Sequence, residues 1–468
     1  MPPVGIVVDN PRRDLEGAVL LASALARRGR PAILVPLYAQ GADIPLLGLE
    51  GVVLNYLRLN NAALARSYKR LGMRLFVMDT EGGVLSAEGA DAPANWAAWL
   101  ASSGLGELAD RYFCWGNEVA DAFRAAMPDK DFHVTGCPRY DLCDPAFRNY
   151  FEYPVRDFVL VNTNFSALNP SLQRRADDEK RAFASAGFSS AYVDRLLGDI
   201  KISFDRFRAT IASMAKALPN RHFVLRPHPF ENPEIYRTQY AGIPNISVRA
   251  EGSVFHAVAN AACIVHLNCG TAVESALMGR VPINLSFLST AIQDAHTPLP
   301  AELSLNVRSE EEAIAVIEKL IARAGEPPEV AARLERAREV IRPWFGTVDG
   351  HAAQRVAEGI IRTLANNPAA PQRSLATAVR MSHARPSTGQ LAFGALSVGA
   401  GSHWAGRLRG VLQPARRGKD FTARDVEGIL SRLQTVDVRF GDVTCGQAQN
   451  PWSRLPLASV RVDPGTPG

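Results

Sequence analysis

Three short polar stretches directly follow apolar runs, and their side chains could do chemistry. The first is DTEGG, residues 79–83. A carboxylate here could act as a general base towards a substrate hydroxyl, and two neighbouring carboxylates can raise the pKa of one of them. We expect Glu81 to be this base, with Asp79 as second choice, while Gly82 and Gly83 let a substrate approach the backbone closely. The alternative is a plain turn capped by Asp79.

The second stretch is RPHPFE, residues 226–231, which follows the apolar run HFVL. Arg226 offers a planar, permanently charged fork that suits phosphate, and His228 can donate from its ring. The prolines on either side of His228 stiffen the backbone around it. The stretch therefore predicts a phosphate-binding loop; the alternative is a strand-ending turn with a solvated arginine.

The third stretch, HLNCGTAVESALMG, reads as a strand end, a glycine loop and a helix that begins near Thr271. A helix start offers free N–H groups and partial positive charge, so Gly270 and Thr271 are candidate phosphate contacts. Glu274, one turn further, is a candidate for holding ribose hydroxyls. The alternative is a capping box, in which Thr271 and Glu274 bond the backbone of the helix start.

The elements that position these stretches alternate between short apolar runs and helical patterns. Such alternation predicts an α/β fold with parallel, doubly wound sheets. We expect two Rossmann-like domains, residues 1–150 and 151–366, that face each other across a cleft. Ligands of such folds bind outside the carboxyl ends of the strands, so the three stretches are expected in that cleft.

Residues 367–468 differ in composition from the rest of the chain. They are rich in Gly, Pro and Ser and carry most of the excess positive charge, whereas the remainder is nearly neutral. We expect a mostly poorly ordered tail with one helix at 419–434, not required for chemistry. A solvated tail is favoured over contact with the anionic inner face of a membrane.

Composition excludes several classes of protein. The near-neutral body lacks the basic stripe of a nucleic-acid-binding protein. No apolar run approaches the ~20 residues of a membrane helix, and the first residues lack a signal-peptide pattern. The 6 cysteines have no metal-ligand spacing and fit reduced thiols of a cytoplasmic protein. No acidic metal motif is evident, so neither a metal nor another cofactor is expected.

A set of motifs carries a family resemblance over about residues 4–365. VDNPRRDLEG, LNYLRLNN, MDTEGG, CWGNEVAD, VTGCPRYDL, RPHPFE and NCGTAVESALMGRVPI together resemble the bacterial surface-carbohydrate (capsule or lipopolysaccharide) biosynthesis proteins. Those proteins are similar to glycosyltransferases of the two-domain B type. The sequence also partly resembles bacterial sialyltransferases and polymer glycerophosphotransferases, whose HP histidine and hydroxyl-bearing loop face the nucleotide phosphates. Their paired-hydroxyl motif is Cys269-Gly270-Thr271 here, with one hydroxyl.

The resemblance implies transfer of a sugar from a nucleotide-sugar to a glycan or lipid-linked acceptor, by inversion with a carboxylate base. Glu81 and Asp79 would then be the catalytic candidates. The nucleotide-side candidates are Arg226, His228, Gly270, Thr271, Glu274, Asn162 and Asn164. The acceptor-side candidates are Asp9, Asn10, Arg12, Arg13, Gly82 and Gly83.

Two other classes stay open at this point, because a fold hosts many functions. One is another enzyme on the same scaffold, either a nucleotide-sugar epimerase or a polyol-phosphate transferase. An epimerase would convert a nucleotide-sugar with no acceptor present. The other is a non-catalytic assembly protein, which absence of nucleotide binding would favour.

Overall fold

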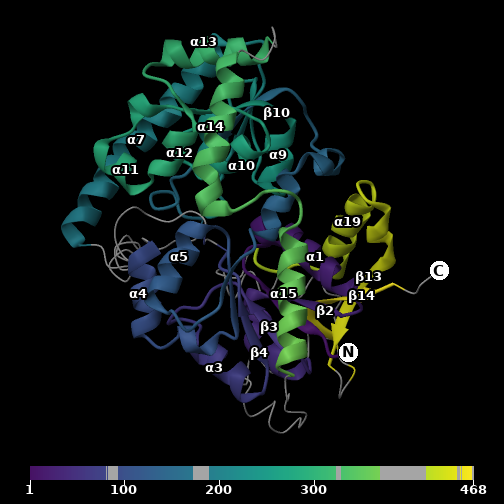
Figure 1. Cartoon of the computed structure of the whole chain (residues 1–468). Coiled ribbons are helices and arrows are strands. Elements are labelled where there is room, and N and C mark those ends of the chain that lie inside the picture. Colours follow the sequence, from purple (N-terminus) through teal and green to yellow (C-terminus); the bar gives the residue numbers. More distant parts are fainter. Residues whose placement is uncertain are drawn as a thin grey trace, which may run out of the picture. The chain divides into compact units, whose positions relative to one another are not determined.

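The computed structural model describes residues 1–80, 82, 93–171, 189–322, 328–368, 418–450, 454 and 456–465. The chain divides into two compact units (Figure 1). Unit 1 comprises Met1–Gly82, Ala97–Leu142 and Gly346–Gly468, and unit 2 comprises Gly83–Trp96 and Cys143–Phe345. Each unit holds a sheet with parallel strands and flanking helices, so the predicted α/β fold with two Rossmann-like domains is confirmed.

The sheet of unit 1 has the strand order β13-β14-β2-β1-β3-β4-β5-β6. Its six parallel strands are β1 (Val4–Val8), β2 (Ala32–Pro36), β3 (Gly51–Leu54), β4 (Arg74–Val77), β5 (Arg111–Cys114) and β6 (Phe132–Val134). They read as near-continuous apolar runs because helices cover both faces of such a sheet. The connecting helices are α1 (Pro11–Ala26), α2 (Gln40–Asp43), α3 (Ala62–Arg70), α4 (Pro93–Ser102) and α5 (Asn117–Ala126).

Local sequence explains how α1 begins directly after β1. Asn10 is the N-cap, and its side-chain oxygen accepts from the backbone N–H of Arg12 at 3.2 Å. Pro11 occupies the first helical turn, where a missing N–H costs nothing. The cap therefore fixes Asp9 at the carboxyl end of β1 and Arg13 in the first turn of α1.

The described part of the C-terminal segment holds a strand hairpin in addition to the one helix expected there. Residues 418–465 contain α19 (Ala423–Gln434), β13 (Val443–Gln449) and β14 (Pro456–Pro464). β13 and β14 pair antiparallel, and β14 pairs antiparallel with β2, so this segment extends the sheet of unit 1 (yellow in Figure 1). The helix at 419–434 was anticipated, but the hairpin was not, because β13 reads VTCGQAQ and lacks an apolar run.

The helix α15 (Ala352–Asn366) also belongs to unit 1 rather than to the second domain. In this helix, Val356, Ile360 and Leu364 are buried. The Asp141 carboxylate accepts from the backbone N–H groups of Ala352 and Ala353, both at 2.8 Å. An amphipathic pattern predicts that one face is buried but not against which sheet. The expected boundaries at 150 and 366 therefore move to 142 and 345.

Unit 2 has a six-stranded, all-parallel sheet of order β12-β11-β10-β7-β8-β9. The strands are β7 (Phe158–Asn162), β8 (Phe223–Arg226), β9 (Ile246–Val248), β10 (Ala261–His266), β11 (Pro282–Asn284) and β12 (Leu305–Asn306). The helices are α7 (Ser190–Ala217), α8 (Glu234–Tyr240), α9 (Val254–Asn260), α10 (Thr271–Leu277), α11 (Ala291–His296), α12 (Pro298–Leu303), α13 (Glu310–Ile321) and α14 (Pro328–Phe345).

Alternate residues of β7 enter separate apolar clusters, as the two-residue period of a strand requires. Val159 and Val161 pack in a cluster with residues of α7 and α13, whereas Phe158 and Leu160 pack in a second cluster with residues of α9. The sheet is therefore covered on both faces, and its carboxyl edge is where polar side chains can gather.

Candidate functional site

The nucleotide-side candidates of unit 2 gather at the carboxyl edge of its sheet. β7 lies between β8 and β10, and Asn162 is in register with Arg226 on one side and with His266 on the other. These strand ends and the loops that follow them carry two of the polar stretches, RPHPFE and HLNCGTAVESALMG, together with Asn162 and Asn164. Doubly wound sheets bind ligands at such an edge.

Two of these loops are joined through side chains. Asn162 Nδ2 donates to Thr271 Oγ1 at 3.0 Å, and Thr271 Oγ1 donates to Cys269 Sγ at 3.3 Å. Asn164 Nδ2 donates to the carbonyl of Asn268 at 3.1 Å. Asn268 adopts a φ of 45°, a left-handed conformation that asparagine tolerates better than most residues. The loop from β10 to α10 is thus held against the loop after β7.

A network of buried hydrogen bonds fixes the RPHPFE loop. Its central residue is Glu231, to which the sequence analysis assigned no role. Glu231 is 3 % exposed, and its carboxylate accepts from Thr163 Oγ1 at 2.9 Å and from Phe165 N at 2.7 Å, and from the Tyr236 hydroxyl. Burial raises the pKa of Glu231, and these hydrogen bonds oppose the rise. Thr163 Oγ1 also accepts from His228 N at 3.1 Å. The network therefore anchors the backbone of His228.

The ring of His228 is held in one tautomer when it is neutral. Its Nδ1 accepts from the backbone N–H of Phe230 at 3.3 Å. An imidazole nitrogen that accepts carries no proton, so the proton of the neutral ring lies on Nε2. The ring of Phe230 lies 5.4 Å from that of His228. His228 is half-buried at the sheet edge, and its Nε2–H is a donor of the kind that phosphate oxygens accept.

Arg226 is placed differently from the sequence prediction of a guanidinium directed at phosphate. It is 6 % exposed, and it donates to the carbonyls of Glu251, at 2.6 Å, and of Gly252. These contacts hold the loop that leads to Ser253, the N-cap of α9. A direct phosphate contact by Arg226 stays a prediction.

The start of α10 is not a capping box. Gly270 is the N-cap, so Thr271 is the first helical residue and its hydroxyl bonds to Asn162 and Cys269 instead. Glu274 lies one turn into the helix and is 8 % exposed. Its predicted contact with ribose stays a prediction.

The acceptor-side candidates of unit 1 lie at the carboxyl edge of the other sheet. Arg13 Nε donates to Asp14 Oδ1 at 2.8 Å, and its Nη2 donates to Asp9 Oδ2 at 3.4 Å and to Thr80 Oγ1 at 3.2 Å. Asn10 N donates to Asp14 Oδ2 at 3.0 Å. Arg13 therefore ties the loop after β1 to the loop after β4.

The DTEGG motif is described only in part. Asp79 is 2 % exposed, and its Oδ2 lies 3.6 Å from Nη2 of Arg58. Gly82 N donates to the carbonyl of Asp79 at 3.3 Å, so a turn forms here. Glu81 and Gly83 lie outside the described residues. The predicted catalytic carboxylate, Glu81, stays a prediction.

Lys419 enters the unit 1 edge from the C-terminal segment, and the sequence gave no signal for it. Its Nζ donates to Asp9 Oδ1 at 2.7 Å. Arg12 is exposed, and its backbone N–H donates to the Asn10 side-chain oxygen at 3.2 Å. A lysine that follows RRG in a basic segment is not distinguishable from its solvated neighbours by type or spacing.

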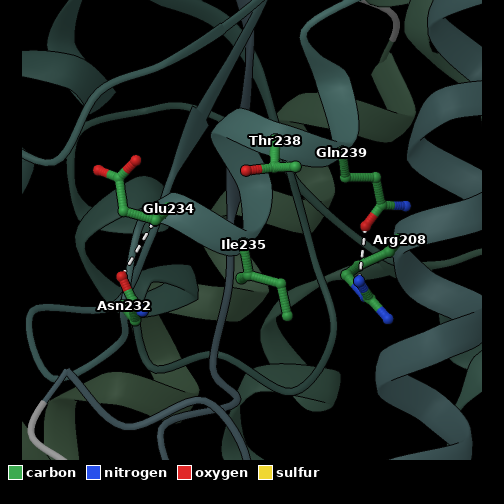
Figure 2. Close-up of a pocket in the computed structure, with 6 residues that line it drawn as sticks. All are labelled: Arg208, Asn232, Glu234, Ile235, Thr238 and Gln239. Carbon is green, nitrogen blue, oxygen red and sulfur yellow. Dashed lines mark hydrogen bonds between the residues drawn. The ribbon is translucent and has the colours of Figure 1, made fainter.

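An open hollow of about 500 Å³ lies elsewhere in unit 2, between α7 and α8 (Figure 2). Its polar side chains are already engaged: Arg208 Nη1 donates to Gln239 Oε1 at 2.7 Å, and Asn232 Oδ1 accepts from the backbone of Glu234 at 3.1 Å. None of the predicted site residues lines it, and we assign it no role.

No group of three or more His, Cys, Asp or Glu side chains is arranged to hold a metal ion in the part of the chain that the structure describes. Among the described helices, none combines the length and the apolar character that crossing a bilayer requires.

No protein-family model and no curated protein matches the sequence. Solved structures do resemble the chain. Staphylococcus aureus MnaA, in a co-structure with UDP, is 12 % identical with a TM-score of 0.48 over 78 % of this chain and 97 % of that chain. The Methanocaldococcus jannaschii UDP-GlcNAc 2-epimerase, in complex with UDP-GlcNAc and UDP, is 12 % identical with a TM-score of 0.46 over 77 % of this chain and 99 % of that chain. The wall teichoic acid polymerase TagF is 12 % identical with a TM-score of 0.45 over 78 % of this chain and 89 % of that chain. At these identities and scores the likeness carries no argument about function.

Proposed function

We propose that this chain is a metal-independent glycosyltransferase that moves a sugar from a nucleotide-sugar to a glycan or lipid-linked acceptor. The observation that carries the proposal is the fixed pair of loops at the carboxyl edge of unit 2. There the His228 backbone is anchored on Thr163, and the Thr271 hydroxyl is held by Asn162. Preorganised donors at such an edge suit the diphosphate of a nucleotide-sugar.

The donor would be held by groups from three strands. His228 donates from Nε2 to a phosphate oxygen. The Thr271 hydroxyl exchanges its hydrogen bond to Cys269 Sγ for one to phosphate, while Asn162 Nδ2 still donates to its oxygen. The main-chain amide of Gly270 makes no hydrogen bond within the described residues and supplies a further donor. Arg226 keeps the neighbouring loop in place, and its positive charge lowers the electrostatic energy of an anion bound at this edge. Glu274 holds the ribose. These protein groups stabilise the negative charge of the phosphates without a metal ion.

The acceptor would be activated by a carboxylate of unit 1. Glu81 takes the proton of the acceptor hydroxyl while that oxygen attacks the anomeric carbon. The bond from this carbon to the nucleotide diphosphate breaks, and the configuration inverts. The burial of Asp79 beside Arg58 favours Glu81 over Asp79 as the base, because a buried, ion-paired carboxylate is poorly placed to meet a substrate hydroxyl. Asp9, Asn10, Arg12, Arg13, Gly82 and Gly83 form the acceptor side.

We place this reaction in bacterial surface polysaccharide synthesis, at the cytoplasmic side of the inner membrane. The proposal is tested by incubating the protein with a panel of UDP-, CDP-, GDP- and dTDP-sugars, each with and without saccharide acceptors, and following both sugar and nucleotide by NMR. Nucleotide release that requires acceptor, with a new glycosidic linkage, supports it. Conversion of the nucleotide-sugar to its epimer in the absence of acceptor would contradict the proposed transfer and indicate an epimerase instead.

A further inference from the structure

Asp294, on the short helix α11, has an exposed carboxylate of which the protein holds one oxygen. Its Oδ1 accepts from Ser289 Oγ at 2.6 Å and from Asn268 Nδ2 at 3.1 Å. Its Oδ2 makes no hydrogen bond or ion pair with any of the described residues. The carboxylate is therefore oriented by two neighbours while its second oxygen is available to a ligand.

The local fold does not depend on the charge of Asp294. At the start of α11, Gln293 Oε1 accepts from the backbone N–H of the N-cap residue Thr290 at 3.0 Å. The loop before the helix is fixed through its main chain, since the carbonyl of Leu288 accepts from Ser203 Oγ at 2.7 Å. An asparagine at position 294 would accept the same two hydrogen bonds at its Oδ1. The negative charge is therefore the feature that the fold leaves unexplained.

Asp294 is tied to the loop that carries the proposed phosphate contacts. Its partner Asn268 stands two residues before Gly270, so the Cα atoms of these two residues are at most about 7 Å apart. The carbonyl of Asn268 also accepts from Asn164 Nδ2 at 3.1 Å. Through Asn268, the carboxylate is thus fixed to the loop before α10 and to the loop after β7, between which we place the diphosphate.

A carboxylate at this edge repels the diphosphate of a nucleotide, so its partner is to be sought in another part of the donor. Carboxylate oxygens accept hydrogen bonds, and hydroxyl groups donate them. The ribose hydroxyls are assigned to Glu274 above, whereas those of the transferred sugar have no assigned partner. We propose that Asp294 Oδ2 accepts from a hydroxyl of the transferred sugar and that its charge selects a neutral sugar over an acidic one. This rests on the proposed function, because it specifies the donor of that reaction.

The test replaces the charge without removing the oxygen that the protein holds. Asp294→Asn keeps an acceptor for Ser289 and Asn268. Glu318→Gln is the matched control, because Glu318 is an exposed carboxylate within α13, outside the loops that follow the strands. Calorimetric titration compares UDP with UDP-glucose, UDP-N-acetylglucosamine and UDP-glucuronic acid, and GDP with GDP-mannose and GDP-mannuronic acid. CDP with CDP-glucose and dTDP with dTDP-glucose complete the set of bases.

The wild type and Glu318→Gln are expected to bind at least one nucleotide with a neutral sugar, and to bind it more tightly than a uronic acid counterpart. Asp294→Asn is expected to weaken the affinity for that nucleotide-sugar by about tenfold or more. Its affinity for the free nucleotide should stay unchanged or rise, because a negative charge near the phosphates is removed.

Three results would overturn the proposal. They are an unchanged nucleotide-sugar affinity in Asp294→Asn, an equal loss for the free nucleotide, which would indicate a ribose contact or a disturbed loop, and a wild type that prefers a uronic acid donor or binds no nucleotide-sugar. If the affinities change as expected but the wild type transfers no sugar to any acceptor, only the proposed function fails.

Discussion

Lys419 Nζ lies 2.7 Å from Asp9 Oδ1, and the two side chains are only 13 % and 14 % exposed. They are separated by most of the chain, so the C-terminal segment supplies a cation to the loop after the first strand. Arg432 of α19 and Glu16 of α1 make a second, longer contact, at 3.7 Å. The segment is therefore part of unit 1 rather than an appendage.

Lys419→Met should destabilise the protein, because it leaves the half-buried Asp9 carboxylate with the longer Arg13 contact alone. We expect a loss of about 1–3 kcal/mol in the free energy of unfolding, measured by urea denaturation. Lys130→Met is the control: its partner Glu107 is 70 % exposed, and such a surface pair contributes less than about 1 kcal/mol. Equal losses in both variants would show that the Lys419–Asp9 pair is not structural.

A chain that ends at Asn366 should melt at a lower temperature or aggregate. It loses β14, which pairs with β2 and whose Val460 and Val462 are fully buried. An unpaired, apolar strand edge is prone to association with other chains. Calorimetry and light scattering measure both effects. A monomeric truncated chain with an unchanged melting temperature would restore the view from sequence that the tail is dispensable.

Asp141 should make stability depend on pH. Burial raises its pKa to about 6, although the backbone N–H groups of Ala352 and Ala353 oppose the rise. The folded state therefore holds a proton that the unfolded state releases above its ordinary pKa near 3.8, so the contribution of this group falls as pH rises from about 4 to about 6. Chemical denaturation at pH 4.5 and pH 7 should show a smaller difference in Asp141→Asn than in the wild type. An identical difference in the two proteins would contradict this.

Glu81→Gln should keep nucleotide affinity and lower turnover by about 10²-fold or more, because the amide cannot take a proton. The loss should fall on kcat rather than KM, since a base acts mainly in the transition state. Asp79→Asn should reduce turnover less. If Asp79→Asn abolishes turnover and Glu81→Gln does not, the two roles are exchanged. If neither changes it, the base lies elsewhere, with Asp9 and Asp14 the next candidates.

The ends of the strands could be predicted from the sequence more successfully than the contacts between distant segments. The alternation of apolar runs and helices predicted β7, β8 and β10, and with them the gathering of Asn162, His228 and Thr271 at one edge. Those predictions depend on local periodicity and on the rule that parallel strands share a carboxyl edge.

The rest depends on nonlocal pairing that periodicity does not encode. β14 adds to β2 across more than 400 positions, and its partner β13 has few apolar residues to mark it. Glu231 follows an exposed phenylalanine in a Pro-rich loop, so nothing in its surroundings signalled a buried carboxylate.

The central claim, a nucleotide site at the carboxyl edge of unit 2, is tested most directly by calorimetric titration of UMP, UDP, CMP, CDP and GDP into the wild type, His228→Ala and His222→Ala. His222 precedes β8 at its amino end and bonds Ser247, so it is the matched control. We predict saturable binding of at least one nucleotide by the wild type and by His222→Ala, weakened about tenfold or more in His228→Ala with the fold retained. No binding of any nucleotide by the wild type, or equal affinity in His228→Ala, would contradict the account.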